Sequence, residues 1–126
     1  MPERKAPYKT RKPQLVPQTE AIFQSAVIEF AWARGWLCYH TWRSDHSEKG
    51  WPDLVLAKEK AWDSDPNNLH DTAWTALLFR ELKGIDAGGR RGRPTKEQEL
   101  WLSTLRAAGL DAEVWWPDSD WQEALK

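Results

Sequence analysis

The order of helix-like and strand-like segments along the chain is the feature that most constrains its fold. Helical apolar spacing occurs twice, and each segment begins at a threonine and ends at a glycine. In residues 19–35 the predicted buried stripe is Phe23, Ala26, Val27 and Phe30, and in residues 95–109 it is Leu102, Leu105 and Ala108. Three strand-like segments lie between these helices and one follows the second: 36–42, 53–57, 73–83 and 112–116. A last short helix is expected from Asp118 to Asp120 onward, with Asp120 and Glu123 at capping-box spacing. This order predicts a mixed α/β domain with a central sheet.

Length and composition indicate one domain. The chain has 126 residues, of which 40% are hydrophobic, enough for a single core. Residues 1–17 contain four prolines and five basic residues, which predicts a basic, flexible N-terminal arm and leaves 18–126 as the domain. Residues 58–72 are polar and predict a loop or irregular excursion. In residues 73–83 the leucines leave a helix open as an alternative to the strand.

The lone cysteine and the hydropathy narrow the class of protein. Cys38 excludes an internal disulfide, and it also excludes a Cys₄ or Cys₂His₂ zinc site. No apolar run approaches the roughly 20 residues of a membrane helix, and the N-terminus does not read as a secretory signal. We therefore expect an intracellular protein of the cytoplasm or nucleoid of a host cell, not a secreted one. Cys38 and His40 share a strand face, and we expect them to pack in the core rather than to bind a metal with His46.

Positive charge is clustered, although the formal net charge is only −1. Besides the arm, a glycine-rich loop at 84–94, expected to be flexible, carries a cluster that continues into the second helix: Arg90, Arg91, Arg93 and Lys96. A further polar loop, just before Asp53, offers four candidates for phosphate contact: Arg43, Ser44, His46 and Lys49. A neutral chain can still present one basic face to a phosphate backbone. The alternative is that these loops are simply solvated.

An acid at the start of one strand and an acid–lysine pair at the end of the next form a candidate catalytic set. Residues two apart on a strand share a face, so Glu81 and Lys83 point the same way. With Asp53, Glu81 can hold a hard divalent cation such as Mg²⁺, which lowers the pKa of a water and neutralises charge on a phosphate. Lys83 can position that water or stabilise developing negative charge. Taken alone, the Glu-x-Lys pattern also fits a surface salt bridge of little energetic weight.

Two residues in the first turns of the two helices complete the candidate set. Glu20 borders the apolar stripe of the first helix and could supply another carboxylate, by contact or through water. It fits equally well a first-turn acid that the helix dipole favours. Gln98 forms a predicted capping box with Thr95 and could touch the water or a scissile phosphate.

These motifs, in this order, resemble the PD-(D/E)xK nuclease superfamily and, more closely, its VRR-NUC (virus-type replication-repair nuclease) domains. The resemblance covers most of residues 19–125 and lies in TEAIFQSAVIEFAWARGW, YHTWRSDHSEKGWPDLVL, LLFRELK, GRPTKEQELWLSTLRAAG and EVWWPDSDWQEAL. It implies a restriction-endonuclease-like core of helix, three strands, helix and strand, with a mixed central sheet and here a short C-terminal helix.

The resemblance also assigns roles by position. Glu20 matches the acid of the first helix, and Asp53 matches the acid of the PD motif. Glu81 and Lys83 match the acid–lysine pair, and Gln98 matches the glutamine of the helix that follows. The backbone carbonyl of Leu82, between the pair, would then be a further metal ligand.

The activity that the resemblance implies is Mg²⁺- or Mn²⁺-dependent hydrolysis of DNA phosphodiester bonds by an endonuclease. Small members of the family resemble Holliday-junction resolvases and act as homodimers. We therefore expect branched DNA, four-way junctions above all, as the substrate, a homodimer, no organic cofactor, and a viral or phage-type role in DNA repair or recombination. Two alternatives stay open: a DNA-binding module that does not cleave, and a restriction-type or flap nuclease of the same superfamily.

Tryptophan is unusually abundant, with ten residues. Five of them fall in periodic segments and are expected in the core: Trp36, Trp42, Trp101, Trp115 and Trp116. Trp51 is the one expected closest to the site, because it adjoins Pro52 and Asp53.

Overall fold

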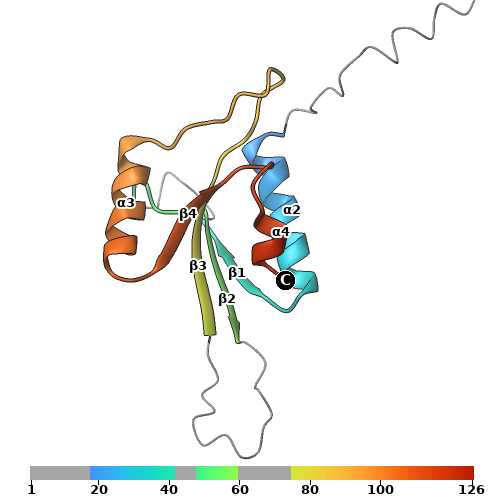
Figure 1. Cartoon of the computed structure of the whole chain (residues 1–126), viewed down its shortest axis with the longest axis vertical. Helices are drawn as coiled ribbons and strands as arrows, with labels where there is room; N and C mark the ends of the chain where they lie inside the picture. The colour runs from blue at the N-terminus through green and yellow to red at the C-terminus, as the bar shows by residue number, and fades with distance from the viewer. Residues whose placement is uncertain (1–17, 42–47, 60–74) are drawn as a thin grey trace, which may run out of the picture.

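The computed structural model describes residues 18–41, 48–59 and 75–126 (Figure 1). Its elements are α2 (Glu20–Ala33), β1 (Leu37–His40), β2 (Leu54–Glu59), β3 (Thr75–Leu82), α3 (Lys96–Ala107), β4 (Asp111–Trp115) and α4 (Trp121–Ala124). The predicted order of elements is confirmed. The four strands form one mixed sheet in the order β1-β2-β3-β4, in which the first three are antiparallel and β4 runs parallel to β3. The predicted arm at 1–17 lies outside the described residues.

Helices cover both faces of this sheet. In Figure 1, α2 and α4 lie on one side of the strands and α3 lies on the other. Side chains alternate along a strand, so Leu54, Leu56 and Leu78 enter the core beneath α2. Phe79 faces the other way and packs with Leu102 of α3. The larger core therefore lies between the sheet and the pair α2 and α4.

The first helix begins and ends where its sequence predicts, but its buried stripe is rotated. Thr19 caps it, with Oγ1 accepting from the Ile22 backbone N–H at 3.2 Å. The buried positions are Phe23, Val27, Ile28 and Ala31. Of the predicted stripe Phe23, Ala26, Val27 and Phe30, two members are therefore only half-buried: Ala26 and Phe30. Phe30 lies at the margin of the helix–sheet core, edge-on to the Trp121 ring of α4 with centroids 5.3 Å apart.

The third strand is the central scaffold of the site. Thr75–Leu82 pairs with β2 on one side and β4 on the other, which excludes the helical alternative. Lys58 and Glu59, predicted to lie in a loop, instead extend β2 in register with β3. The remainder of the predicted excursion, residues 60–74, lies outside the described residues.

In the C-terminal half, the helices begin near the predicted residues, but two details of the prediction are wrong. The capping box of Thr95 and Gln98 is present at the start of α3, but Ala108, predicted in its buried stripe, is an exposed C-cap. The second predicted capping box is wrong: Asp120 makes no side-chain capping bond, and Glu123 pairs with Lys126 at 2.9 Å.

Most of the tryptophans that the structure describes are at least partly buried. Trp36 and Trp115 are in the core, whereas Trp101 and Trp116 are half-buried and Trp42 lies outside the described residues. Trp36 Nε1 donates to the Leu125 carbonyl at 2.9 Å and so ties the C-terminus to the sheet. Cys38 packs against the larger core as expected, and burial raises the pKa of its thiol.

A charged side chain is buried in β3. Arg80 is 3% exposed, lies over the Trp115 ring at 4.7 Å, and pairs with Asp111 at 2.9 Å. It also donates to the Asp111 carbonyl at 2.9 Å. These contacts join β3 to the parallel strand β4.

Among the helices that the structure describes, none has the length and apolar character needed to cross a bilayer.

Candidate active site

Two carboxyl groups meet where β2 begins and β3 ends. The antiparallel register pairs Leu54 with Arg80, so Asp53, one residue earlier, comes opposite Glu81. Asp53 Oδ2 accepts from the Leu82 backbone N–H at 2.7 Å, which fixes this carboxylate against the end of β3. The Asp53 carboxyl group is close enough to Glu81 to raise the pKa of that acid. The predicted pairing of these two acids is therefore present.

Glu81 is a buried acid with one oxygen partnered and one not. Its side chain is 1% exposed. Its Oε2 accepts from Gln98 Nε2 at 2.9 Å and lies 3.7 Å from Lys83 Nζ. Its Oε1 is buried and has no hydrogen-bond partner among the residues that the structure describes. A buried acceptor without a partner is costly, which marks this oxygen as available to a ligand.

The surroundings of Glu81 favour its protonated form. Burial, foremost, and then the hydrogen bond with Asp53 and the charge of Asp53 raise the pKa of Glu81 from 4.5 to about 9, although Lys83 opposes the shift. At neutral pH, Glu81 therefore holds a proton. A carboxyl group must be deprotonated to bind a metal, so a cation that binds Glu81 must displace this proton.

Gln98 is oriented by the start of α3. Its Oε1 accepts from the Thr95 backbone N–H at 2.8 Å, and its own backbone N–H donates to Thr95 Oγ1 at 3.2 Å. With the oxygen engaged in the capping box, the amide nitrogen is directed at Glu81. The structure thus brings Gln98 to the other candidate residues as a partner of the buried acid, and its contact with a water or a phosphate stays a prediction.

Lys83 is held between two acids. It is 8% exposed, and its Nζ lies 3.5 Å from Glu20 Oε1 and 3.7 Å from Glu81 Oε2. Glu20, at the start of α2, has a side chain that is 56% exposed. Asp53, Glu81 and Lys83 therefore meet at one end of the sheet. Glu20 reaches this group through its contact with Lys83.

The donor set fits a hard divalent cation with few protein ligands. Within residues 18–41, 48–59 and 75–126, no group of three or more histidine, cysteine, aspartate and glutamate side chains could hold a metal. Glu20 is therefore not gathered with Asp53 and Glu81 as a third direct ligand. Mg²⁺ commonly binds through one or two carboxylates and keeps several waters. Asp53, the unpartnered Oε1 of Glu81 and the Leu82 carbonyl suit that pattern, because all three are hard oxygen donors.

The segment before Asp53 presses directly against α3. Gly50 has a φ of +90°, and a Cβ there would lie 2.4 Å from the Glu97 carbonyl carbon and 2.8 Å from the Gln98 nitrogen. The Trp51 ring packs edge-on against Phe79 and Trp101, with centroids 6.0 and 4.9 Å away. Trp51 therefore packs the segment before Asp53 against β3 and α3 and does not itself join the carboxylates. Sequence reasoning missed Gly50, and its position three residues before Asp53 was the only signal.

The glycine-rich loop at 84–94, predicted to be flexible, makes several specific contacts. Ile85 forms bridges with Gln18 and with Arg91. Asp86 Oδ1 accepts from the backbone N–H groups of Gly88 and Arg90, each at 2.9 Å. The loop is therefore a closed turn, because a carboxylate caps its tip.

The basic residues proposed for DNA contact differ in their availability. Arg90 pairs with Asp86 at 3.0 Å, and Lys49 pairs with Glu97 at 3.2 Å. Arg91 pairs with Asp118 at 3.0 Å and lies over the Trp116 ring at 4.6 Å. Two residues are exposed and form no ion pair in the described part of the chain: Arg93 and Lys96. Three others lie outside the described residues: Arg43, Ser44 and His46.

Comparison with known proteins returns no relatives: no family model, no curated protein and no solved structure matches the chain.

Proposed function

We propose that this chain is a Mg²⁺- or Mn²⁺-dependent DNA endonuclease of the PD-(D/E)xK type, with a VRR-NUC-like domain. The observation that carries the proposal is the convergence of four side chains at one end of the sheet. Asp53 and Glu81 meet across β2 and β3, while Lys83 and Gln98 both contact the same oxygen of Glu81. Acid pairs of this kind with a buried lysine suit phosphodiester hydrolysis.

Each residue has a distinct task in this proposal. Asp53, Glu81 and the Leu82 carbonyl would hold the cation, which lowers the pKa of water and offsets charge on the phosphate. The Lys83 ammonium, held 3.5 Å from Glu20, orients the attacking water or stabilises negative charge that develops on the phosphate. Glu20 would reach such a cation only through water, because it is not gathered with Asp53 and Glu81 as a direct ligand. Gln98 keeps Glu81 in place and can reach the phosphate or the water.

The proton on Glu81 links cation binding to pH. In the free protein its pKa is about 9, so at neutral pH a cation must displace a proton before the carboxylate can serve as a ligand. Lys83 offsets part of the negative charge that the release of this proton creates. The site is therefore expected to bind the cation more tightly as the pH rises toward 9.

Branched DNA is the proposed substrate and a homodimer the proposed assembly, because a four-way junction presents two symmetric scissile phosphates. The part of the sheet that α3 leaves uncovered provides an apolar surface for a second copy. Leu37 and Leu77 flank Ala57 in one row across β1, β2 and β3, and they are 74% and 39% exposed. Tyr39, on the same face of β1, is 61% exposed.

Cleavage of labelled four-way junction, flap and linear duplex in Mg²⁺, Mn²⁺ or EDTA tests the proposal. The informative variant is Asp53→Ala, and its matched control is Asp120→Ala, which removes an exposed carboxylate that makes no capping bond. Paired symmetric cuts in the junction that vanish in EDTA and in Asp53→Ala, but persist in Asp120→Ala, would support a resolvase-like nuclease. Metal-dependent cutting of flap or linear DNA instead would support metal-dependent phosphodiester hydrolysis but exclude the four-way junction as the preferred substrate. Binding without cutting in any metal would favour a non-cleaving DNA-binding module.

A further inference from the structure

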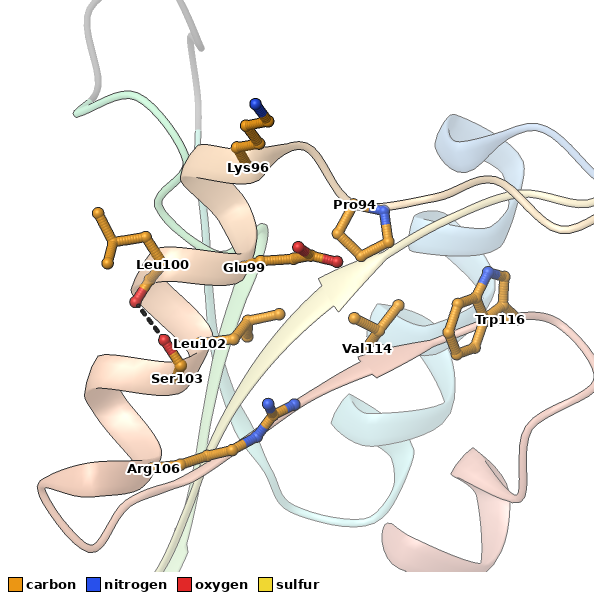
Figure 2. Close-up of a pocket in the computed structure, with 9 residues that line it drawn as sticks. All are labelled: Pro94, Lys96, Glu99, Leu100, Leu102, Ser103, Arg106, Val114 and Trp116. Carbon is orange, nitrogen blue, oxygen red and sulfur yellow. Dashed lines mark hydrogen bonds between the residues drawn. The ribbon is translucent and has the colours of Figure 1, made fainter.

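An open pocket of about 640 Å³ lies between α3 and β4, next to the carboxylate site but outside the residues assigned to it (Figure 2). Its floor is apolar and is formed by Leu102, Val114 and Trp116. Pro94 lies at the end where the chain enters α3, and Trp116 also lines a neighbouring recess with Arg91. The pocket thus combines a flat aromatic ring with an aliphatic floor.

Two opposite charges extend into this pocket. Figure 2 shows the carboxylate of Glu99 and the guanidinium of Arg106 both reaching from α3 toward β4, whereas Lys96 and Leu100 point away. Arg106 Nε donates to the Ala112 carbonyl, which anchors the guanidinium and leaves its two terminal nitrogens. Among the described residues, Glu99 has no ion-pair partner, so its carboxylate is available.

The pocket is one strand away from the proposed catalytic acids. The parallel register pairs Val114, in the pocket floor, with Glu81, so the two lie on neighbouring strands about 5 Å apart. On the helix, Glu99 follows Gln98, the partner of Glu81. A nucleotide with its phosphate at Glu81 could therefore place the base of a neighbouring nucleotide in the pocket.

The chemistry of the pocket selects one kind of base. A planar heterocycle can stack on Trp116 and lie on the aliphatic floor. Guanine presents O6 and N7 as acceptors to an arginine. Its N1–H and N2–H groups can both donate to a carboxylate. Guanine can therefore make two hydrogen bonds to Arg106, through O6 and N7, and two to Glu99, through N1–H and N2–H. The N1–H and N2–H groups are occupied in a Watson–Crick pair, so only an unpaired guanine can use both residues.

We propose that the α3–β4 pocket binds one unpaired guanine of the DNA strand whose phosphate occupies the Asp53–Glu81 site. This inference rests on the proposed nuclease function and specifies its substrate: DNA with an unpaired guanine beside the cleaved bond. A flap already carries such unpaired nucleotides, and a four-way junction supplies one only where a pair opens at the branch point, whereas continuous duplex supplies none.

Fluorescence anisotropy in Ca²⁺, an oxygen-binding cation that can occupy the carboxylate site but is expected not to support cleavage, tests the pocket. The probes are flap duplexes whose unpaired nucleotides are all thymine, or contain one guanine, adenine or cytosine at each position beside the branch. The wild type is expected to bind the best-placed guanine probe about tenfold tighter than the thymine probe. Equal affinity for all four probes would overturn the proposal.

Two variants and a control separate base recognition from general damage. Glu99→Gln removes the acceptor charge, and Ser103→Trp fills the pocket from an exposed helical position. Both are expected to abolish the guanine preference. Glu29→Gln, the same change on the exposed face of α2, is expected to retain it. A guanine preference that survives in Glu99→Gln and Ser103→Trp would refute the assignment of this pocket.

The same proteins in the cleavage assay distinguish this inference from the proposed function. Guanine preference in binding without cleavage in Mg²⁺ or Mn²⁺ would support the pocket and reject the nuclease. Metal-dependent cleavage that is indifferent to the unpaired base would support the nuclease and reject the pocket. Competition by dGMP as tight as the guanine probe would also reject the strand assignment, because it would indicate a site for free nucleotides.

Discussion

Replacing Gly50 by alanine should damage the site without changing any of its side chains. Gly50 has a φ of +90°, and a Cβ there would lie 2.4 Å from the Glu97 carbonyl carbon, 2.5 Å from its oxygen and 2.8 Å from the Gln98 nitrogen. All three contacts are to backbone atoms, so no side-chain rotation can relieve them. The segment at residue 50 and the first turn of α3 must therefore move apart, and we expect Gln98, which lies in that turn, to shift. Since Gln98 Nε2 contacts Glu81 Oε2 at 2.9 Å, that shift reaches the buried acid.

Gly109 provides a matched control for this substitution. Its φ is +87°, nearly the same, but a Cβ there would meet nothing within 4 Å. A left-handed conformation costs a residue with a Cβ roughly 1–2 kcal/mol relative to glycine. Gly109→Ala should therefore lose about 1–2 kcal/mol of unfolding free energy and little else. Gly50→Ala bears the same cost plus about 1–3 kcal/mol for overpacking, and so should lose about 2–5 kcal/mol.

Urea unfolding and junction cleavage measure the two effects separately. For folded protein below its unfolding transition, kcat/KM of Gly50→Ala should fall by roughly 10–100-fold, because small displacements of positioning groups are costly in an active site. Gly109→Ala should cleave at the rate of the wild type. Equal stability loss and equal activity in the two variants would refute the argument that Gly50 sets the position of Gln98.

Three further predictions address the buried acid, the proposed assembly and the C-terminal anchor. Folding raises the pKa of Glu81 to about 9, so the stability that its protonation provides is full below pH 4.5 and is lost as the pH rises through 9. In EDTA the unfolding free energy should therefore fall by up to about 1.4 kcal/mol per pH unit between these values, and Glu81→Gln should remove this part of the pH dependence. The same pH dependence in Glu81→Gln and wild type would contradict the raised pKa. Leu37→Glu should convert a dimer to a monomer in light scattering without lowering thermal stability, whereas Glu29→Gln should not; a dimer that persists would exclude this face. Trp36→Phe should lower the unfolding free energy by about 1–3 kcal/mol, since it leaves the buried Leu125 carbonyl without the 2.9 Å bond from Trp36 Nε1, and chemical denaturation with no change in midpoint would argue against that anchor.

The sequence predicted the features that depend on local chemistry. Thr19 and Thr95 cap their helices because a hydroxyl can accept from the first free backbone N–H groups, a property of a few adjacent residues. The alternation of apolar residues likewise indicated the strands. Asp53 and Glu81 could be expected to meet, because the strands that carry them are consecutive. In an antiparallel pair, the start of one strand lies beside the end of the other.

Features that depend on contacts between distant parts of the chain could not be predicted from the sequence. Arg80 sits in what reads as an apolar strand, and its burial depends on a parallel neighbour, β4, that supplies Asp111 and the Trp115 ring. The basic loop reads as flexible, but Asp86 closes it and Ile85 fastens it to Gln18. The stripe of α2 was misjudged because its buried side is set by packing against the sheet as well as α4, and Phe30 meets only the edge of this core, at Trp121. None of these contacts follows from spacing along the chain.

The central claim is that the Asp53–Glu81 pair hydrolyses DNA with a divalent cation. Cleavage of a labelled four-way junction by wild type and by Glu81→Gln, in Mg²⁺ and in EDTA, tests it most directly. The glutamine preserves the size of a side chain that is 1% exposed, but it cannot lose a proton to become the carboxylate that would hold the cation. We predict paired cuts by the wild type in Mg²⁺ alone, and none by folded Glu81→Gln. Cleavage that persists in EDTA, or at the wild-type rate in Glu81→Gln, would contradict the account.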